Sequence, residues 1–547
     1  MVLSLRRFRP LTVCAIVILL LELCASIWPV YGKAIWVVWI CLSLVILAAA
    51  ASDLTFLILS FARLEAVLTP CAVIFSIYII ASGIILPQNL SGEITQEISC
   101  ALHYFDKDPG FGARKTCLFG YPARQLFLPS MFSAWFGRSQ LDLNLGGAIW
   151  LLAGLPVFGA GLIRKFSNFP KFRADMLAAL AVAILPHFFY YNHFAFSYEQ
   201  SIFPLSFSLL AIGFACSFIA LDRSYFFYLA VGVLLIAVHS YTPSLSLVLL
   251  GIILLVESLR RNTFPRIESA SAMLLLICSL VISYSYRTDA VAARGAVDFV
   301  KYAEDFRDAW LHLFYLIPGP YMLSDWVHIP VLVLLFAVLL GALGWRYALL
   351  SAWIFAVIMA AYISKGYVYY GFGFRHHRAL VAAPFVGLLI SEVFRVYFKR
   401  KYFDYVLLPL VLAMMFGGAY IQSQFLLNKN PGRHFSYIDY MIPEMTNEPT
   451  KLLFAEPLYK DYVSIDDILK YFYPKADSQV LPLECKPWVL EESKKTSVLI
   501  LNDLTLDQLP SCFRDYHQSF APHAVLNWDF EGSGKNLRIT VLKRKSI

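Results

Sequence analysis

Residues 202–239 read IFPLSFSLLAIGFACSFIALDRSYFFYLAVGVLLIAVH, and this stretch decides the fold class. Two apolar runs are separated only by Asp222 and Arg223, and a third run follows at 241–258 after a short turn. Runs of about 17–25 apolar residues are long enough to cross a bilayer as helices. The pattern therefore predicts consecutive membrane spans that are joined by tight turns.

The composition extends this interpretation to the whole chain. Of its 547 residues, 59% are hydrophobic and 15% are charged, whereas soluble domains carry roughly 25% charge. The formal net charge of +8 does not indicate nucleic-acid binding, because basic residues of such proteins mark cytoplasmic loops. Arg6, Arg7 and Arg9 precede a long apolar run without a clear cleavage site, so we expect a retained first span rather than a signal peptide.

We predict an all-α polytopic membrane protein with about 11–13 transmembrane helices, followed by a small extracytoplasmic α/β or α+β domain. The predicted transmembrane domain is 1–421 and the soluble C-terminal domain is 422–547. The expected spans are 11–31, 34–51, 66–86, 145–163, 174–191, 202–221, 224–239, 241–258, 268–285, 330–344, 347–364, 379–396 and 404–421.

Basic residues set the expected orientation. The short loops that hold Arg63, Arg164, Arg223 and Arg346 are nearly all basic, whereas the alternate loops carry fewer basic residues over far more chain. Such a bias over short loops places them in the cytoplasm. The N-terminus is then cytoplasmic, and the C-terminal domain lies outside with two large external loops, 87–144 and 286–329.

The C-terminal domain has alternating and helical patterns. SVLILND at 497–503 and LRITVL at 537–542 are typical of strands, and SIDDILKYF at 464–472 is typical of a helix. These patterns are the reason to expect an α/β or α+β domain.

Cysteines divide by predicted location. Cys100 and Cys117 lie in the first external loop, and Cys485 and Cys512 lie in the tail. Thiols on the predicted outer face fit an oxidising compartment, so these residues are disulfide candidates, with four free thiols as the alternative. The remaining cysteines are in predicted spans, where thiols are ordinary small hydrophobes: Cys14, Cys24, Cys41, Cys71, Cys216 and Cys278.

The first external loop contains a polar stretch, HYFDKDPGFGARKTCLFGYPARQ at 103–125. Asp106 and Asp108 either form a solvated turn or act as a base on an acceptor hydroxyl or amine. An apolar, aromatic segment follows and resembles a helix lying on the membrane surface, which favours the second interpretation. The basic residues of this loop are candidates for binding a phosphate: Arg114, Lys115 and Arg124.

A second polar cluster, Arg375, His376, His377 and Arg378, precedes the span at 379–396. Such residues anchor a helix at the interface, but two guanidiniums also hold a departing phosphate well. Between two spans, His193 and Glu199 form either a short polar turn or a second site that binds a metal or the acceptor.

Motifs for phosphate-loop, dinucleotide, zinc-protease and serine-hydrolase chemistry are absent from the sequence. An envelope polysaccharide polymerase or ligase, a transporter or flippase of a lipid-linked sugar, and a non-catalytic scaffold remain alternatives. The predicted spans are nearly free of mid-membrane charge, and the polar clusters lie at the outer boundary, which argues against the transporter.

The arrangement resembles the GT-C superfamily of membrane glycosyltransferases, near the protein O-mannosyltransferases and lipid A aminoarabinose transferases. Three features carry the likeness: the external acidic motif of Asp106 and Asp108, the G-Y-P-A element at 120–123, and the R-H-H-R-A-L-V-A-A-P segment at 375–384. The acidic motif here reads D-K-D, where the family has an adjacent D-E pair.

The resemblance implies transfer of a sugar from a polyprenyl-phosphate donor to an extracytoplasmic protein, lipid or glycan. Asp106 or Asp108 would be the base, and Arg114, Arg124, Arg375 and Arg378 would hold the lipid phosphate. No nucleotide and no nucleic acid is expected, and a divalent cation, Mg²⁺ or Mn²⁺, is left open. We expect the chain in a bacterial inner membrane.

Overall fold

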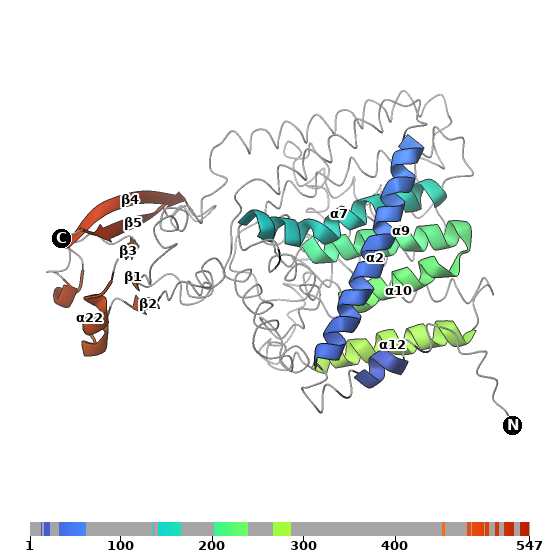
Figure 1. Cartoon of the computed structure of the whole chain (residues 1–547), viewed down its shortest axis with the longest axis horizontal. Coiled ribbons are helices and arrows are strands. Elements are labelled where there is room, and N and C mark those ends of the chain that lie inside the picture. The colour runs from blue at the N-terminus through green and yellow to red at the C-terminus, as the bar shows by residue number, and fades with distance from the viewer. Residues whose placement is uncertain are drawn as a thin grey trace, which may run out of the picture.

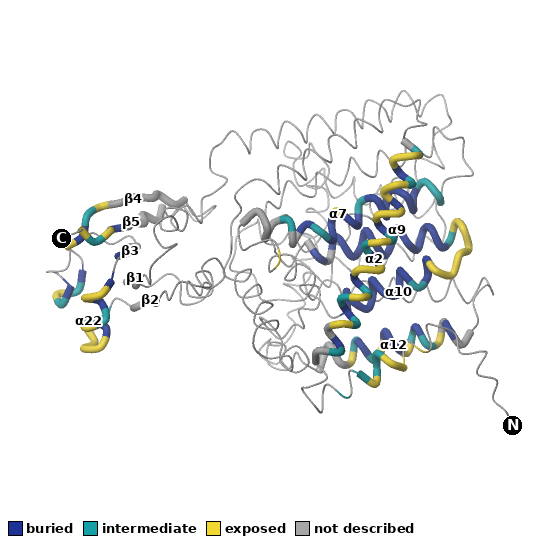
Figure 2. Tube along the Cα trace, in the orientation of Figure 1, coloured by how far each residue is buried: buried dark blue, intermediate teal, exposed yellow. Residues whose placement is uncertain are grey.

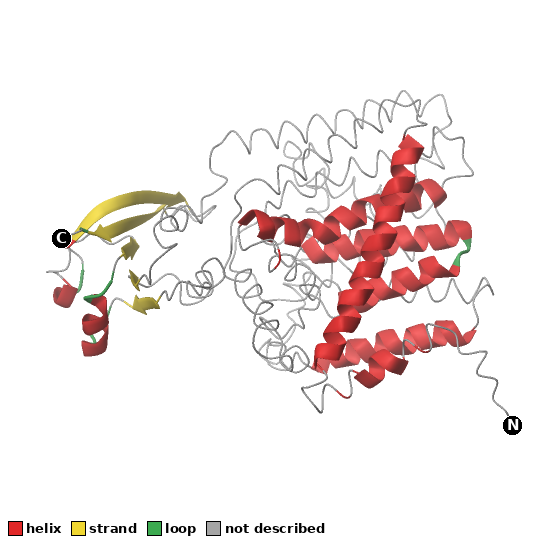
Figure 3. Cartoon of the chain, in the orientation of Figure 1, coloured by secondary structure: helices red, strands yellow, loops and turns green. Residues whose placement is uncertain are grey.

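The computed structural model describes a set of helices in the first half of the chain and a sheet near its end (Figures 1 and 3). The described residues are mostly helical. The structure describes 13, 16–21, 24, 32–61, 135, 140–165, 202–238, 266–285, 451–454, 479–482, 484–496, 498–502, 509–513, 519–529 and 536–545.

The long described helices fall where apolar runs predict spans. They are α2 (Gly32–Phe61), α7 (Gln140–Lys165), α9 (Ile202–Leu221), α10 (Ser224–Val238) and α12 (Arg266–Ser285). Two segments, Val37–Ser60 and Ala148–Lys165, are apolar and long enough to cross a membrane. Shorter apolar helices cover Leu205–Leu221, Ser224–Val238 and Ala270–Val281.

Two of these helices are longer than the sequence predicts. The expected span 34–51 is too short, because α2 continues to Phe61 past Asp53. The charge of Asp53 does not end the helix, since Arg164 of α7 pairs with it. The helix α7 begins at Gln140, inside the expected external loop 87–144, so that its first turn is polar and precedes the apolar run.

Helices α7 and α9 pack through glycines. A Cβ atom on Gly161 would lie 2.8 Å from the Cα of Gly213, and one on Gly213 would lie 2.7 Å from the backbone nitrogen of Phe158. Small residues let membrane helices approach this closely. In their first halves, Trp150 of α7 contacts Phe207 of α9, with 5.4 Å between ring centroids. Near their last turns, Arg164 of α7 contacts Ser217 of α9. The two helices are therefore parallel, as one intervening predicted span requires.

The turn from α9 to α10 contains Asp222 and Arg223 only. Asp222 has a positive φ of 55° and its backbone N–H donates to the carbonyl oxygen of Phe218 at 2.8 Å. Asp and Asn tolerate this left-handed conformation better than other non-glycine residues. The predicted tight turn is confirmed at these residues.

Helix α2 crosses the other described helices at a steep angle (Figure 1). Its inner face carries Trp39, Ile46, Ala50, Asp53 and Leu57, all buried at spacings of about one or two helical turns. The opposite face is exposed, as the yellow segments of α2 show (Figure 2), and it carries Val37, Leu44, Val45, Leu54, Ile58 and Leu59.

The C-terminal residues form a mixed five-stranded sheet with the order β2-β1-β3-β5-β4. The strands are β1 (Lys451–Phe454), β2 (Gln479–Pro482), β3 (Val498–Asn502), β4 (Phe520–Asp529) and β5 (Asn536–Arg544). β1 pairs in parallel with β2 and β3, whereas β5 pairs antiparallel to β3 and β4. The register shifts between Pro522 and Ala524, where proline has no N–H to donate. The strands predicted around 497–503 and 537–542 are confirmed.

The short helix α22 (Pro487–Ser493) connects β2 to β3 and covers part of the sheet. Its Val489 packs in a buried cluster with Leu499, Leu509, Phe513, Phe520 and Leu542. A disulfide joins Cys485, just before α22, to Cys512, with 5.9 Å between their Cα atoms. The structure thus pairs the two tail cysteines that the sequence indicated.

Several expected features lie outside the described residues. They are the helix at 464–472, the candidate pair Cys100 and Cys117, the loop 286–329, and the spans 66–86, 174–191, 241–258, 330–344, 347–364, 379–396 and 404–421.

Candidate functional site

The predicted catalytic and substrate-binding residues all lie outside the described residues. The structure therefore brings none of them together and separates none, and their roles stay predictions. They are Asp106, Asp108, Arg114, Lys115, Arg124, His193, Glu199, Arg375, His376, His377 and Arg378.

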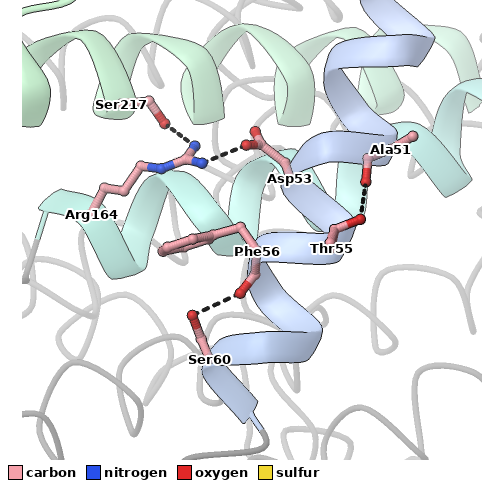
Figure 4. Close-up of polar contacts among 7 residues, drawn as sticks. All are labelled: Ala51, Asp53, Thr55, Phe56, Ser60, Arg164 and Ser217. Carbon is pink, nitrogen blue, oxygen red and sulfur yellow. Dashed lines mark hydrogen bonds and ion pairs between the residues drawn. The ribbon is translucent and has the colours of Figure 1, made fainter.

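A buried charged cluster links three of the described helices (Figure 4). Arg164, in the last turn of α7, donates from Nη2 to Asp53 Oδ1 of α2 at 2.6 Å. Its other terminal nitrogen, Nη1, donates to Ser217 Oγ of α9 at 3.0 Å. We call Asp53, Arg164 and Ser217 the α2–α7–α9 cluster.

Aromatic rings enclose the guanidinium of this cluster. The Cζ atom of Arg164 lies 4.5 Å from the ring centroid of Phe56 on α2 and 5.0 Å from that of Phe226 on α10. A guanidinium at such distances is attracted by the negative face of an aromatic ring. Arg164 therefore contacts α2, α9 and α10 from its position on α7.

The carboxylate of the cluster is buried. The side chain of Asp53 is 4% exposed and that of Arg164 is 12% exposed. Asp53 Oδ2 has no hydrogen-bond partner among the described residues. Two opposite charges withdrawn from solvent each depend on the other, since a lone buried charge costs several kcal/mol.

Other polar side chains of α2 are satisfied within the helix itself. Ser43, Thr55 and Ser60 donate to the carbonyl oxygens of Trp39, Ala51 and Phe56 at 2.8, 3.0 and 2.8 Å. Hydroxyls in helices commonly make this bond to the residue four positions earlier. Asp53 accepts and cannot donate when ionised, so it takes its partner from α7.

The sequence reasoning missed Asp53. Its signal was an acidic residue inside the apolar run AAAASDLTFLIL at 48–59, which is rare in a span and usually paired. The expected span 34–51 ended two residues before Asp53, so this charge was not counted inside a span, whereas the structure places it within α2. Arg164 was assigned only to a cytoplasmic loop, and the structure places it in the last turn of α7.

Metal binding was left open by the sequence. Among the described residues, no group of histidine, cysteine and acidic side chains is placed to hold a metal ion. The carboxylates that were considered for a metal or the acceptor, including Glu199, lie outside the described ranges.

Comparison with known proteins gives a structural likeness only. No family model and no curated protein matches the chain. The structure is similar to ArnT from Cupriavidus metallidurans in the apo state, with 12% identity and a TM-score of 0.49 over 86% of this chain and 96% of ArnT. The same protein bound to undecaprenyl phosphate matches at 10% identity and a TM-score of 0.49, over 89% and 98%. ArnT is a GT-C lipid A aminoarabinose transferase.

Proposed function

We propose that this chain is an integral-membrane glycosyltransferase of the GT-C type. It moves a sugar from a polyprenyl-phosphate donor to an acceptor on the extracytoplasmic side. The observation that carries the proposal is the combination of D-K-D at 106–108 and R-H-H-R at 375–378, both expected at the outer boundary of a polytopic chain. With a TM-score just under 0.5, the likeness to ArnT carries none of this argument.

The chemistry follows from these residue types. Asp106 or Asp108 takes the proton from an acceptor hydroxyl or amine as that group attacks the anomeric carbon. The bond from this carbon to the phosphate oxygen breaks, and the electron pair leaves with the lipid phosphate. Arg375 and Arg378 stabilise the departing negative charge, assisted by Arg114 and Arg124. Attack on the face opposite the leaving group inverts the anomeric centre.

Features of the described residues support the outer location of this site. The parallel α7 and α9 agree with the alternation of spans on which the orientation depends. The disulfide between Cys485 and Cys512 fits a tail in an oxidising compartment. Basic residues in the last turn of α7 and in the α9–α10 turn fit the cytoplasmic side.

The test is transfer from a panel of synthetic polyprenyl-phosphate sugars by the purified full-length chain. Asp106→Asn and Asp108→Asn each remove one candidate base, and loss of the true base lowers kcat by about 10²–10⁴-fold. Arg223→Met, in the α9–α10 turn, is the matched control and leaves turnover unchanged. Normal turnover in both aspartate variants contradicts the assigned base.

A transporter or flippase is the second candidate, and the buried charge of Asp53 is the observation that favours it. Intramembrane acids often mark translocation pathways. Here Arg164 already pairs with Asp53, which weakens that interpretation. Movement of a fluorescent polyprenyl-phosphate sugar across vesicles, without any sugar transfer, would favour the transporter.

A further inference from the structure

Basic residues from two distant segments meet at one end of the C-terminal sheet. Lys494 and Lys495 follow α22, whereas Lys543 and Arg544 end β5 and Lys545 comes directly after it. The two segments are in contact, because Arg544 Nη1 donates to the carbonyl oxygen of Lys494 at 2.5 Å. We call these five residues the basic end of the sheet.

The folded backbone holds the basic end in place. Arg544 also lies over the ring of Phe520, with 6.0 Å from Cζ to the ring centroid. The backbone N–H of Lys545 donates to the carbonyl oxygen of Ser519 at 2.8 Å. The positions from which these cations extend are therefore set before any partner binds.

Acidic residues of α22 neutralise only part of this charge. Lys495 Nζ lies 3.3 Å from Glu492 Oε1, and Glu491 is exposed beside it in the sequence. No ion pair joins Lys494 or Lys545 to another of the described residues, and both side chains are exposed. The basic end therefore presents a net positive charge to solvent.

The cations surround the end of the sheet. Successive residues of a strand point to opposite faces. Leu542 packs in the buried cluster with Val489 of α22, so Arg544 lies on the face that α22 covers and Lys543 lies on the opposite face. A small anion would contact one face only, whereas a polymer with repeated negative charges can follow the cations from one face to the other.

The composition and place of the basic end favour one kind of polymer. Lysine is depleted in the cores of protein–protein interfaces, and four of these five residues are lysines, which argues against an acidic protein. β5 ends on the side of the sheet away from the helices (Figure 1), which argues against the bilayer around the helices. The partner then comes from the extracytoplasmic space, where the disulfide of this domain fits.

An exposed aromatic ring lies near the basic end. Trp488 of α22 is 50% exposed, and about 10 Å of helix separates it from Lys494 and Lys495. An indole ring offers a flat apolar face, on which the apolar face of a sugar ring can stack. A charged glycan could use both the cations and the ring.

We propose that the basic end of the sheet binds an acidic glycan polymer outside the membrane. The contact is electrostatic, with the carboxylates or phosphates of successive sugars on the cations, and Trp488 adds a stacking contact. This inference depends on the outer location of the domain and not on sugar transfer, so it stands or falls separately from the proposed function.

Binding of fluorescent polygalacturonate to the purified full-length chain in neutral detergent tests the proposal. The polymer binds at low salt and is released in about 1 M NaCl, where the Debye length is about 3 Å. Neutral dextran does not bind. Lys494→Gln and Lys545→Gln each lower the affinity about 5-fold, and the double variant lowers it about 25-fold, as expected for basic residues at an anionic surface.

Lys486→Gln is the matched control, because Lys486 is exposed in the same domain and already pairs with Glu484. It changes the affinity less than about two-fold. Acetylation of the wild-type chain provides a second readout that needs no variant. Bound polygalacturonate protects Lys494 and Lys545 from acetylation and leaves Lys486 reactive, as mass spectrometry of the peptides measures.

Polyphosphate separates a glycan from any other polyanion, since it has charges but no sugar ring. Trp488→Ala weakens polygalacturonate a few-fold and leaves polyphosphate unchanged. Equal effects on the two polymers contradict the glycan. The whole inference is overturned when the double lysine variant binds polygalacturonate like wild type, or when the chain binds phosphatidylglycerol vesicles or an acidic protein but not the polymer.

Discussion

Helix α7 is joined to its two neighbours in different ways. Its contact with α9 relies on close backbone approach at Gly161 and Gly213, and only one hydrogen bond, from Arg164 to Ser217, is described beyond the glycines. Its contact with α2 relies on a buried ion pair at 2.6 Å. The first kind of contact is possible because glycine has no Cβ atom. In the second, each buried charge is stabilised by the opposite charge. Replacing both charges should therefore restore stability that replacing one charge removes, whereas replacing glycines should only lower stability.

The largest effect is expected where one charge is removed. Arg164→Met leaves the Asp53 carboxylate buried alone and lowers the free energy of unfolding by about 3–5 kcal/mol. Asp53→Leu added to it restores most of this stability. Thermal unfolding in detergent measures both variants, and additive losses would show that the charges do not depend on each other.

The second largest effect is expected at the disulfide of the C-terminal sheet, a covalent link that can be compared with the non-covalent ion pair. Cys485→Ser removes the bond to Cys512, which closes a loop of chain with a sequence separation of 27. Bonds of this kind contribute about 2–4 kcal/mol. Protease resistance of the C-terminal domain should fall in the variant, and reduction of the wild-type chain with a thiol should reproduce the effect without further loss in the variant.

A smaller effect is expected at the glycine contact. Gly213→Ala puts a Cβ against the backbone of Val157 and Phe158, which cannot move aside easily. Overpacking of this kind costs about 1–3 kcal/mol. Gly232→Ala is the matched control, because its Cβ would meet the flexible end of Leu42, at Cδ1. Equal loss of thermal stability in both variants would contradict a backbone contact between α7 and α9.

The smallest effect is expected for a polar group that serves its own helix. Thr55→Val removes a hydroxyl that donates to Ala51 at an exposed position. Surface changes of this kind usually stay within about 0.5 kcal/mol. A larger loss of thermal stability would show that a polar contact of α2 other than the ion pair holds the helix.

The sequence predicts local elements well where the chain itself marks their ends. The span 202–221 matches α9 because Asp222 and Arg223 interrupt the apolar pattern. The end of α2 was wrong because the partner that allows Asp53 in a helix lies 111 residues away. Apart from Asp53, the sequence does not indicate which face of α2 is buried, since apolar residues lie all round the helix.

In the sheet and in the proposed site, too, local patterns were predictable and contacts between distant segments were not. The strands β3 and β5 were predicted from alternation, but their adjacency joins residues such as Val498 and Lys543 that no local pattern connects. For the site, residue types identify a base and phosphate-binding groups. Their convergence depends on contacts between distant segments, which residue types do not specify, so Asp106, Asp108, Arg375 and Arg378 remain predictions.

The outward face of α2 has a practical consequence. Cys41 is exposed on this helix, near Val37, Leu44 and Val45. A nitroxide attached to its thiol would report collisions with oxygen dissolved in the hydrocarbon. Cys41 is therefore a native attachment point for a probe of how deep the helix lies in the bilayer, once the other free cysteines are replaced.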